Sequence, residues 1–183
     1  MKIVLWVVGV IIFLVITMAV SFGRIISESN RPRGNHEEVL KSSLPSPKKA
    51  LVVYQPSSSD MSSRMAHKIA SGINSEGYEV ILNYPGDHLP TTVSEFDVVV
   101  FGSAVYAGQP SKLLVDYISK IRVGSNCKVA LYSTGSVKEE LELDNMEKTL
   151  KDAKAYRKIK FNVNEKSEND IKAYNFGQEL AKE

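Results

Sequence analysis

The chain has 183 residues, a formal net charge of +2 and 43% hydrophobic residues. This length allows one domain of ordinary size and argues against a second independent domain. The charge is too small to predict a nucleic-acid-binding surface. The single cysteine, Cys127, cannot form an intramolecular disulfide, which excludes a disulfide-stapled domain; we interpret Cys127 as a packing residue.

Residues 3–22 form an uncharged run in which only Gly9, Thr17 and Ser21 are weakly polar. As an α-helix these 20 residues would extend about 30 Å, the thickness of the hydrocarbon core of a bilayer. We therefore expect a transmembrane anchor over residues 1–23 that contacts membrane lipid through residues 3–22. The alternative is a cleavable signal peptide, although the apolar part of such a peptide is usually only about 7 to 15 residues long.

Basic residues near the ends of this run predict its orientation. Residues 1–47 carry five Lys or Arg and three Asp or Glu, whereas residues 48–183 carry 18 of each. Basic residues resist translocation, so the end of the run with more of them stays in the cytoplasm. We expect a single-pass protein of the cell membrane whose main domain faces the cytoplasm. The basic residues that follow the run are Arg24, Arg31, Arg33 and Lys41.

Residues 24–47 are expected to form a flexible tether. Three prolines, Pro32, Pro45 and Pro47, interrupt regular structure in a segment rich in Ser, Asn and charge. The apolar pair Val39-Leu40 is compatible with a short helical turn, but no fold is expected here.

From residue 48 onward, short β-branched runs alternate with longer segments of helical periodicity. This alternation is typical of βαβ units and of a parallel sheet covered by helices on both faces. We expect an α/β domain over residues 48–183 with a doubly wound, five-stranded parallel sheet, the commonest arrangement for this order of elements. Strands are expected at 50–54, 78–82, 97–102, 127–133 and 158–163, and helices at about 61–76, 110–121, 138–153 and 169–181, with only a short helix or turn at 90–95.

Ligands of such sheets bind beyond the carboxyl ends of the strands, which confines a site to the loops at 55–63, 103–109 and 133–136. The first loop places five serines between a buried strand and the start of a helix. Backbone N–H groups and the helix dipole favour an anion there, and serine hydroxyls add neutral donors, so the loop predicts phosphate binding. The competing interpretation is an ordinary turn in which Asp60 is the helix N-cap.

Residues 49–54, the serine loop and residues 77–80 together resemble the opening of flavodoxins and flavodoxin-like oxidoreductases. The loop pattern of that family is Ser/Thr-x-Ser/Thr-Gly-x-Ser/Thr, and the resemblance implies binding of the FMN phosphate. Asp60 stands where the family has glycine and brings a carboxylate near the phosphate. An alternative register, counted from Tyr54, places Ser59 at the glycine position. The matching residues are Ser57, Ser58, Ser59, Asp60, Met61 and Ser62.

The other two loops extend the resemblance. The stretch after the third strand is similar to the family's Gly-Ser-Pro-x-Tyr-x-Gly, which implies that Tyr106 stacks on the flavin ring. The glycines at 102 and 108 are expected to let the backbone approach a ligand closely. The loop after the fourth strand is similar to the one whose backbone contacts the flavin edge. The site residues implied here are Ser103, Ala104, Val105, Tyr106, Gly108, Ser133, Thr134 and Gly135.

The resemblance implies a membrane-tethered, FMN-binding domain that acts in electron transfer or as a flavin-dependent oxidoreductase, a group that includes the flavodoxin-like protoporphyrinogen oxidases. A membrane anchor suits a quinone or a redox protein as partner. The alternative, favoured by Asp60, is a flavin-free scaffold that binds another phosphorylated ligand or a protein at the membrane. No catalytic residue is predicted, and no metal site either, because His88 has no second His or Cys near it in the sequence.

Overall fold

One sheet with the strand order β1-β3-β2-β4-β5-β6 forms the centre of the computed structural model, which describes residues 2–137, 139–151 and 153–182. Five of its strands are parallel to their neighbours, and β1 is antiparallel to β3. In chain order the elements are α1 (Lys2–Ser29), β1 (Glu38–Leu40), β2 (Lys49–Gln55), α2 (Met61–Ser75), β3 (Glu79–Asn83), β4 (Val98–Ala104), α3 (Lys112–Ile118), β5 (Lys128–Gly135), α4 (Leu141–Thr149), β6 (Arg157–Asn162) and α5 (Lys166–Ala181).

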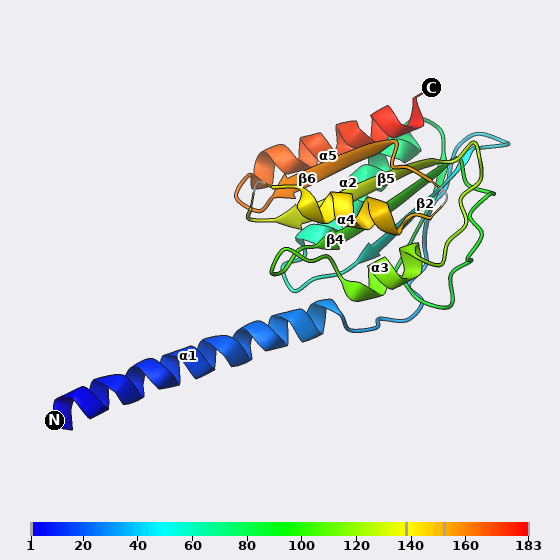
Figure 1. The fold of residues 1–183 in the computed structure, drawn as a ribbon. Helices are drawn as coiled ribbons and strands as arrows, with labels where there is room; N and C mark the ends of the chain where they lie inside the picture. The colour runs from blue at the N-terminus through cyan, green and yellow to red at the C-terminus, as the bar shows by residue number, and fades with distance from the viewer. Residues whose placement is uncertain (1, 138, 152, 183) are drawn as a thin grey trace.

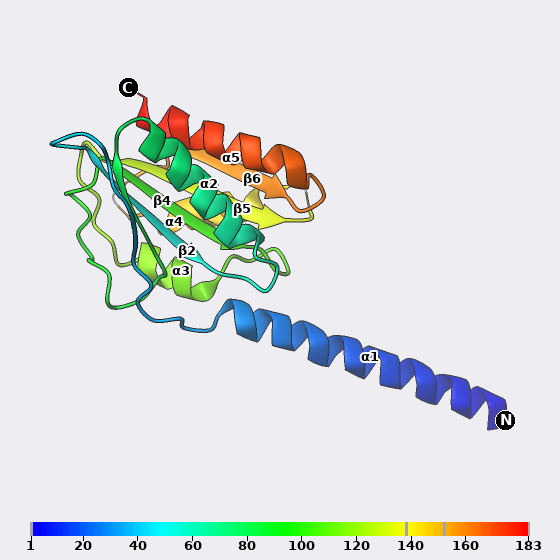
Figure 2. The ribbon, with the colours of Figure 1, turned by 180° about the vertical axis from the view of Figure 1, so that it is seen from behind.

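Helices cover both faces of the sheet, as the predicted doubly wound arrangement requires. Successive side chains of a strand point to opposite faces, so Val52 of β2 packs on the side of α2 and α5, whereas Val53 packs on the side of α3 and α4. Figure 1 shows α3 and α4 on one side of the sheet, and the reverse view in Figure 2 shows α2 and α5 on the other. The central strands β2 and β4 are buried along most of their length.

The prediction of five parallel strands is wrong by one, because β1 adds a sixth, antiparallel strand. It lies within the segment that was expected to be a flexible tether, where Val39 pairs with Ile81 of β3. The reason is tertiary: β3 would otherwise be an open edge, and a three-residue strand is too short to show a period in the sequence. Asn74 of α2 also holds this segment, since its side-chain amide donates to the carbonyl oxygens of Leu40 and Lys41.

Three predicted helices differ in extent from those observed, one of them only at its start, where α5 begins at Lys166 and not near residue 169. The helix expected at 138–153 is observed as the shorter helix α4, Leu141–Thr149. Residues 138 and 152 of the expected helix lie outside the described residues. The helix expected from residue 110 begins as α3 at Lys112, with Ser111 as N-cap.

The N-terminal helix α1 projects away from the domain, as Figure 1 shows. It extends to Ser29, beyond the predicted end at residue 23. Among the described residues, Trp6–Ser29 is the segment long and apolar enough to cross a membrane, with a mean hydropathy of 2.5 and no burial against the domain in its most apolar part. An apolar, exposed helix at this position is either a membrane anchor or a signal sequence.

Candidate functional site

The carboxyl ends of β2, β4 and β5 meet at one edge of the sheet, as parallel strands require. We call the loops there, residues 56–60, 105–110 and 136–140 without residue 138, the carboxyl edge. All three sequence-predicted loops are therefore brought together.

The first loop ends in a turn whose backbone matches the glycine position of the predicted pattern. The Asp60 N–H donates to the Ser57 carbonyl oxygen at 3.3 Å, and Asp60 has a φ of 50°. This left-handed conformation is one that glycine adopts readily and aspartate tolerates. It supports the register with Asp60, rather than Ser59, at the glycine position. The Asp60 side chain is exposed and makes no cap hydrogen bond to α2.

The serines of this loop divide into structural and available hydroxyls. Ser62 is buried and donates to the Gln55 carbonyl oxygen at 3.0 Å, so its hydroxyl holds the loop to the end of β2. The Ser57 hydroxyl is also buried and lies 3.1 Å from that of Ser59. Ser58 and Ser59 are exposed. With the N–H groups at the start of α2, which have no partner within the helix, they are the donors open to an anion.

Met61 packs in the core against the sheet, although it belongs to the predicted phosphate loop. Its side chain is buried and faces away from solvent. It therefore positions the first turn of α2.

The second loop is a tight hairpin. Tyr106 and Gln109 exchange two backbone hydrogen bonds of 3.0 Å, and the two residues between them, Ala107 and Gly108, have φ values of 52° and 73°. Two positive φ values are typical of type I′ turns. A left-handed alanine costs about 1 kcal/mol, and backbone strain of this kind gathers at functional sites.

The base of the hairpin is fixed by Ser103, which is buried at the end of β4. Its hydroxyl accepts a hydrogen bond from the Ser111 N–H at 2.9 Å and donates to the Ala104 carbonyl oxygen. The Val105 N–H then donates to the Thr134 carbonyl oxygen at 2.8 Å, which ties the second loop to the third.

A buried ion pair lies beside the third loop. The Glu142 carboxylate of α4 lies 2.7 Å from Lys160 Nζ of β6, and only 4% and 6% of these two side chains are exposed. The Ser133 hydroxyl donates to the same carboxylate at 2.7 Å, and Lys160 also donates to the Glu139 carbonyl oxygen. The charges are thus compensated by each other and by two further polar groups.

A cavity of about 460 Å³ lies between the second and third loops. Its size falls in the range of small-molecule sites. Val105, Val137 and Leu141 contribute apolar surface, while Glu142 and Lys160 contribute buried charge. The lining also includes Gly108 and Gly135 of the predicted site, whereas Tyr106 is half-buried and is not among the described residues that line the cavity.

The predicted role of Gly102 is wrong. A Cβ at this position would lie 1.7 Å from the ring of Tyr132, so the glycine makes room for a core side chain and not for a ligand. The Tyr132 hydroxyl crosses the core to donate to the Ser62 carbonyl oxygen at 2.9 Å, and burial raises its pKa. Tyr132 thereby joins β5 to the first turn of α2.

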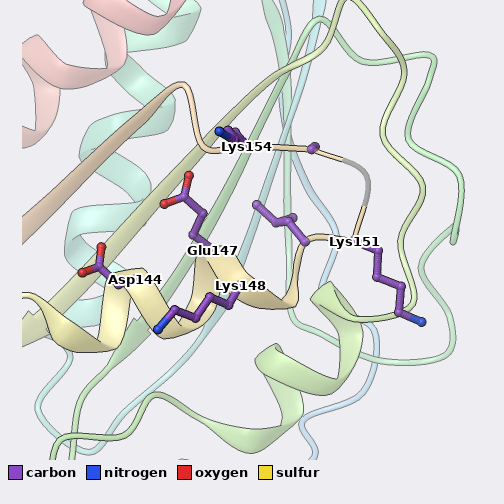
Figure 3. Close-up of a pocket in the computed structure, with 7 residues that line it drawn as sticks. Asp144, Glu147, Lys148, Lys151 and Lys154 are labelled. Atoms are coloured by element: carbon purple, nitrogen blue, oxygen red, sulfur yellow. The ribbon is translucent and has the colours of Figure 1, made fainter.

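A larger cavity, of about 720 Å³, lies beside α4 and is shown in Figure 3. Its carboxylates are already paired: Lys158 Nζ lies 2.6 Å from Asp144 and 2.8 Å from Glu147, and this pairing lowers the pKa of both acids. Lys148 and Lys151 point in different directions in Figure 3. Because these acids are already engaged by Lys158 and the described lysines of the lining do not point to a common centre in Figure 3, we regard the carboxyl edge as the better candidate.

The sequence reasoning missed Glu142 and Lys160. They are 18 positions apart and belong to different elements, so only their pairing in the fold reveals them. The local sequence does not distinguish Lys160, because Lys158 also directly precedes an apolar residue in the same strand and is more exposed.

No family model matches the chain, and no curated protein matches it. Solved structures do. The flavodoxin of Megasphaera elsdenii is 18% identical with a TM-score of 0.57, and the match covers 73% of this chain and 99% of that one. The flavodoxin of Streptococcus pneumoniae TIGR4 is 16% identical with a TM-score of 0.58, and the match covers 73% of this chain and 97% of that one.

Rubredoxin oxygen:oxidoreductase of Desulfovibrio gigas also matches, with 15% identity and a TM-score of 0.58, over 74% of this chain and 36% of that one. These comparisons establish a flavodoxin-like fold for the domain.

Proposed function

We propose that the domain binds FMN at the carboxyl edge and acts in electron transfer or as a flavin-dependent oxidoreductase. The observation that carries this proposal is the cavity between the second and third loops, on the same edge as the left-handed turn at Asp60. Flavodoxins of the same fold support it.

The donors at the carboxyl edge fit such a cofactor. The hydroxyls of Ser58 and Ser59 and the first N–H groups of α2 would bind the phosphate. The backbone around Val105, Gly108 and Gly135 would line the ring, which Tyr106 would stack against if its side chain turns toward the cavity. When bound, FMN supplies the electron chemistry, while the protein sets its orientation and electrostatic environment. Lys160 and Glu142 would place a compensated pair of charges beside the ring.

Several of the other predicted residues act through the loops. Ser62 and Ser103 hold the first and second loops by hydrogen bonds to the backbone. Ser133 orients the Glu142 carboxylate, and the Thr134 carbonyl oxygen fixes Val105. We assign these residues a positioning role.

The proposal includes membrane attachment. Residues 1–23 would anchor the domain of residues 48–183 to the cell membrane, on the cytoplasmic side because of the basic residues that follow the apolar run. A quinone or a membrane-bound redox protein would then be the electron partner.

Titration of the full-length, detergent-solubilised chain with FMN tests the flavin. We expect quenched flavin fluorescence and a changed visible absorbance band. Tyr106→Ala should weaken binding, while Tyr156→Ala, which removes an exposed tyrosine far from the site, should not. An unchanged flavin signal at high micromolar FMN would contradict the proposal.

The second candidate is a flavin-free scaffold that binds another phosphorylated ligand or a protein. The exposed carboxylate of Asp60, beside the helix start where a phosphate would lie, favours it. Absence of flavin binding together with thermal stabilisation by another phosphorylated compound would support this candidate.

A further inference from the structure

The chain between α1 and β1 is hydrogen-bonded to the carboxyl edge of the sheet. Asn30 Oδ1 accepts hydrogen bonds from the Lys112 backbone N–H at 2.7 Å and from the Ser111 hydroxyl at 3.1 Å, both at the start of α3. The Gln55 side-chain amide donates to the Arg31 carbonyl oxygen at 3.1 Å. The end of α1 is therefore joined directly to the end of β2 and the start of α3.

The contacts continue along the same segment until β1 begins. The Asn83 side-chain amide donates to Asn35 Oδ1 at 2.7 Å, and Asn83 Oδ1 accepts the His36 N–H at 2.9 Å. The His36 ring stacks on Tyr84 with the ring centroids 4.8 Å apart. Residues 30–36 are thus bound at both ends, which holds the end of α1 at the carboxyl edge.

The carboxyl edge lies on the side toward which α1 projects. In Figures 1 and 2 the arrowheads of β5 and β6 point toward the side of the N-terminal end of α1, and the loops at the amino ends of the strands lie at the far side. The helical stem from Phe22 to Ser29 adds about 10 Å at 1.5 Å per residue. The headgroup layer extends roughly 5–8 Å beyond the hydrocarbon core on each side, so the end of the stem reaches its outer surface.

We propose that the carboxyl edge is an interaction surface for the lipid bilayer, against whose headgroup layer α1 holds it. Val137 and Leu141 lie beside the cavity on this edge and are 60% and 69% exposed. Apolar side chains of this kind gain from contact with the membrane interface. The cavity then opens at the membrane surface, where an electron carrier dissolved in the bilayer reaches it. This inference rests on the membrane attachment in the proposed function, and not on flavin binding.

Fluorescent labels at the two edges test the orientation. Burial raises the pKa of the Cys127 thiol to about 11, and Cys127→Ser removes it from the labelling altogether. In that background, Ser136→Cys places a label on the carboxyl edge and Ser125→Cys places one at the amino ends of the strands, both at exposed positions. In phosphatidylcholine vesicles with a nitroxide on the headgroups, we expect strong quenching at position 136 and little at 125. Equal quenching at the two positions would overturn the proposal.

Lengthening the stem provides the matched control. An insertion of two helical turns after Gly23 moves the domain about 10 Å from the membrane and changes its rotation by only about 20°. Quenching at position 136 should then be largely lost, while circular dichroism shows an unchanged fold. Quenching that persists in this variant would show that α1 does not hold the edge to the bilayer.

The outcomes separate this inference from the others. FMN titration of the same unlabelled protein tests flavin binding alone. If the chain binds FMN but shows equal quenching at the two positions, only the proposed orientation is wrong. If it shows the expected quenching but does not bind FMN, only the proposed flavin binding is wrong. The intact mass of the membrane-purified protein reveals whether the apolar N-terminal run is cleaved off as a signal peptide, which would overturn membrane docking through α1.

Discussion

Asp60 combines a backbone that suits a phosphate loop with a side chain that opposes one. Its φ of 50° is that of a glycine position, yet its carboxylate repels an anion. A like charge about 4 Å away in water costs about 1 kcal/mol, which is about fivefold in affinity. We expect Asp60→Gly and Asp60→Asn each to strengthen FMN binding by about this factor, measured by fluorescence titration.

Riboflavin, which lacks the phosphate, is the control for this effect. Both substitutions should leave riboflavin affinity unchanged, since the repulsion acts on the phosphate. Equal gains for the two flavins would contradict the assigned phosphate loop. Because Asn tolerates the left-handed conformation, Asp60→Asn isolates the charge from the backbone.

The buried pair Glu142–Lys160 is the second residue-scale feature with a measurable consequence. Removing one partner of a buried ion pair costs about 3–5 kcal/mol, because the other charge is left unpaired. We expect Glu142→Gln to lower the free energy of unfolding by about this amount in urea denaturation. The double variant Glu142→Gln, Lys160→Met should recover most of the loss.

An exposed pair elsewhere in the chain provides the comparison. Lys172 and Glu165 lie 3.0 Å apart with nearly half of each side chain exposed, and such pairs contribute about 0–1 kcal/mol. If Glu142→Gln cost no more than Glu165→Gln, burial of the first pair would have no energetic consequence.

At the scale of elements, α2 and α5 approach each other closely through two glycines. A Cβ at Gly72 would lie 2.1 Å from the Tyr174 carbonyl oxygen, and one at Gly177 would lie 2.2 Å from the Ile69 carbonyl oxygen. Helix backbones cannot yield to such contacts without separating. The glycines therefore set the distance between the two helices that cover this face of the sheet.

Gly72→Ala tests this packing. Alanine has the higher helix propensity by about 1 kcal/mol, so propensity alone would stabilise the variant. Overpacking should reverse the sign and reduce the free energy of unfolding by about 1–3 kcal/mol. Ser71→Ala, at the exposed neighbouring position, should change it by less than about 0.5 kcal/mol. Similar effects of the two substitutions would show that the helices separate without cost.

Local patterns predicted the elements whose residues carry a strong period. The apolar strand Val98–Ala104 and the amphipathic helix Met61–Ser75 lie close to their expected positions. Pairings that join distant segments had no such signal: β1 with β3, Asn30 with α3, and Glu142 with Lys160. The same distinction explains Gly102, whose local context suggested a ligand and whose actual neighbour, Tyr132, lies on another strand.

For the whole molecule, two properties decide which partners reach the candidate site: the compartment of the domain and the direction of its carboxyl edge. The proposed direction of the edge is argued from the contacts of residues 30–36 and the direction of α1, and the charge pattern does not predict it. The proposed cytoplasmic compartment is argued from the basic residues after the apolar run alone, and the contacts do not predict it. An edge that faces the bilayer serves a cytoplasmic electron donor only if the domain is also cytoplasmic.

The compartment can be tested with a membrane-impermeant maleimide. In the Cys127→Ser background, Ser136→Cys should stay unlabelled in intact cells and react after permeabilisation, whereas Lys2→Cys should react from outside. The reason is that translocating the segment with more Lys and Arg is disfavoured. The reverse labelling pattern would place the domain outside the cytoplasm. The fold and the proposed edge orientation would be unaffected, but the proposed electron donor would have to come from the other compartment.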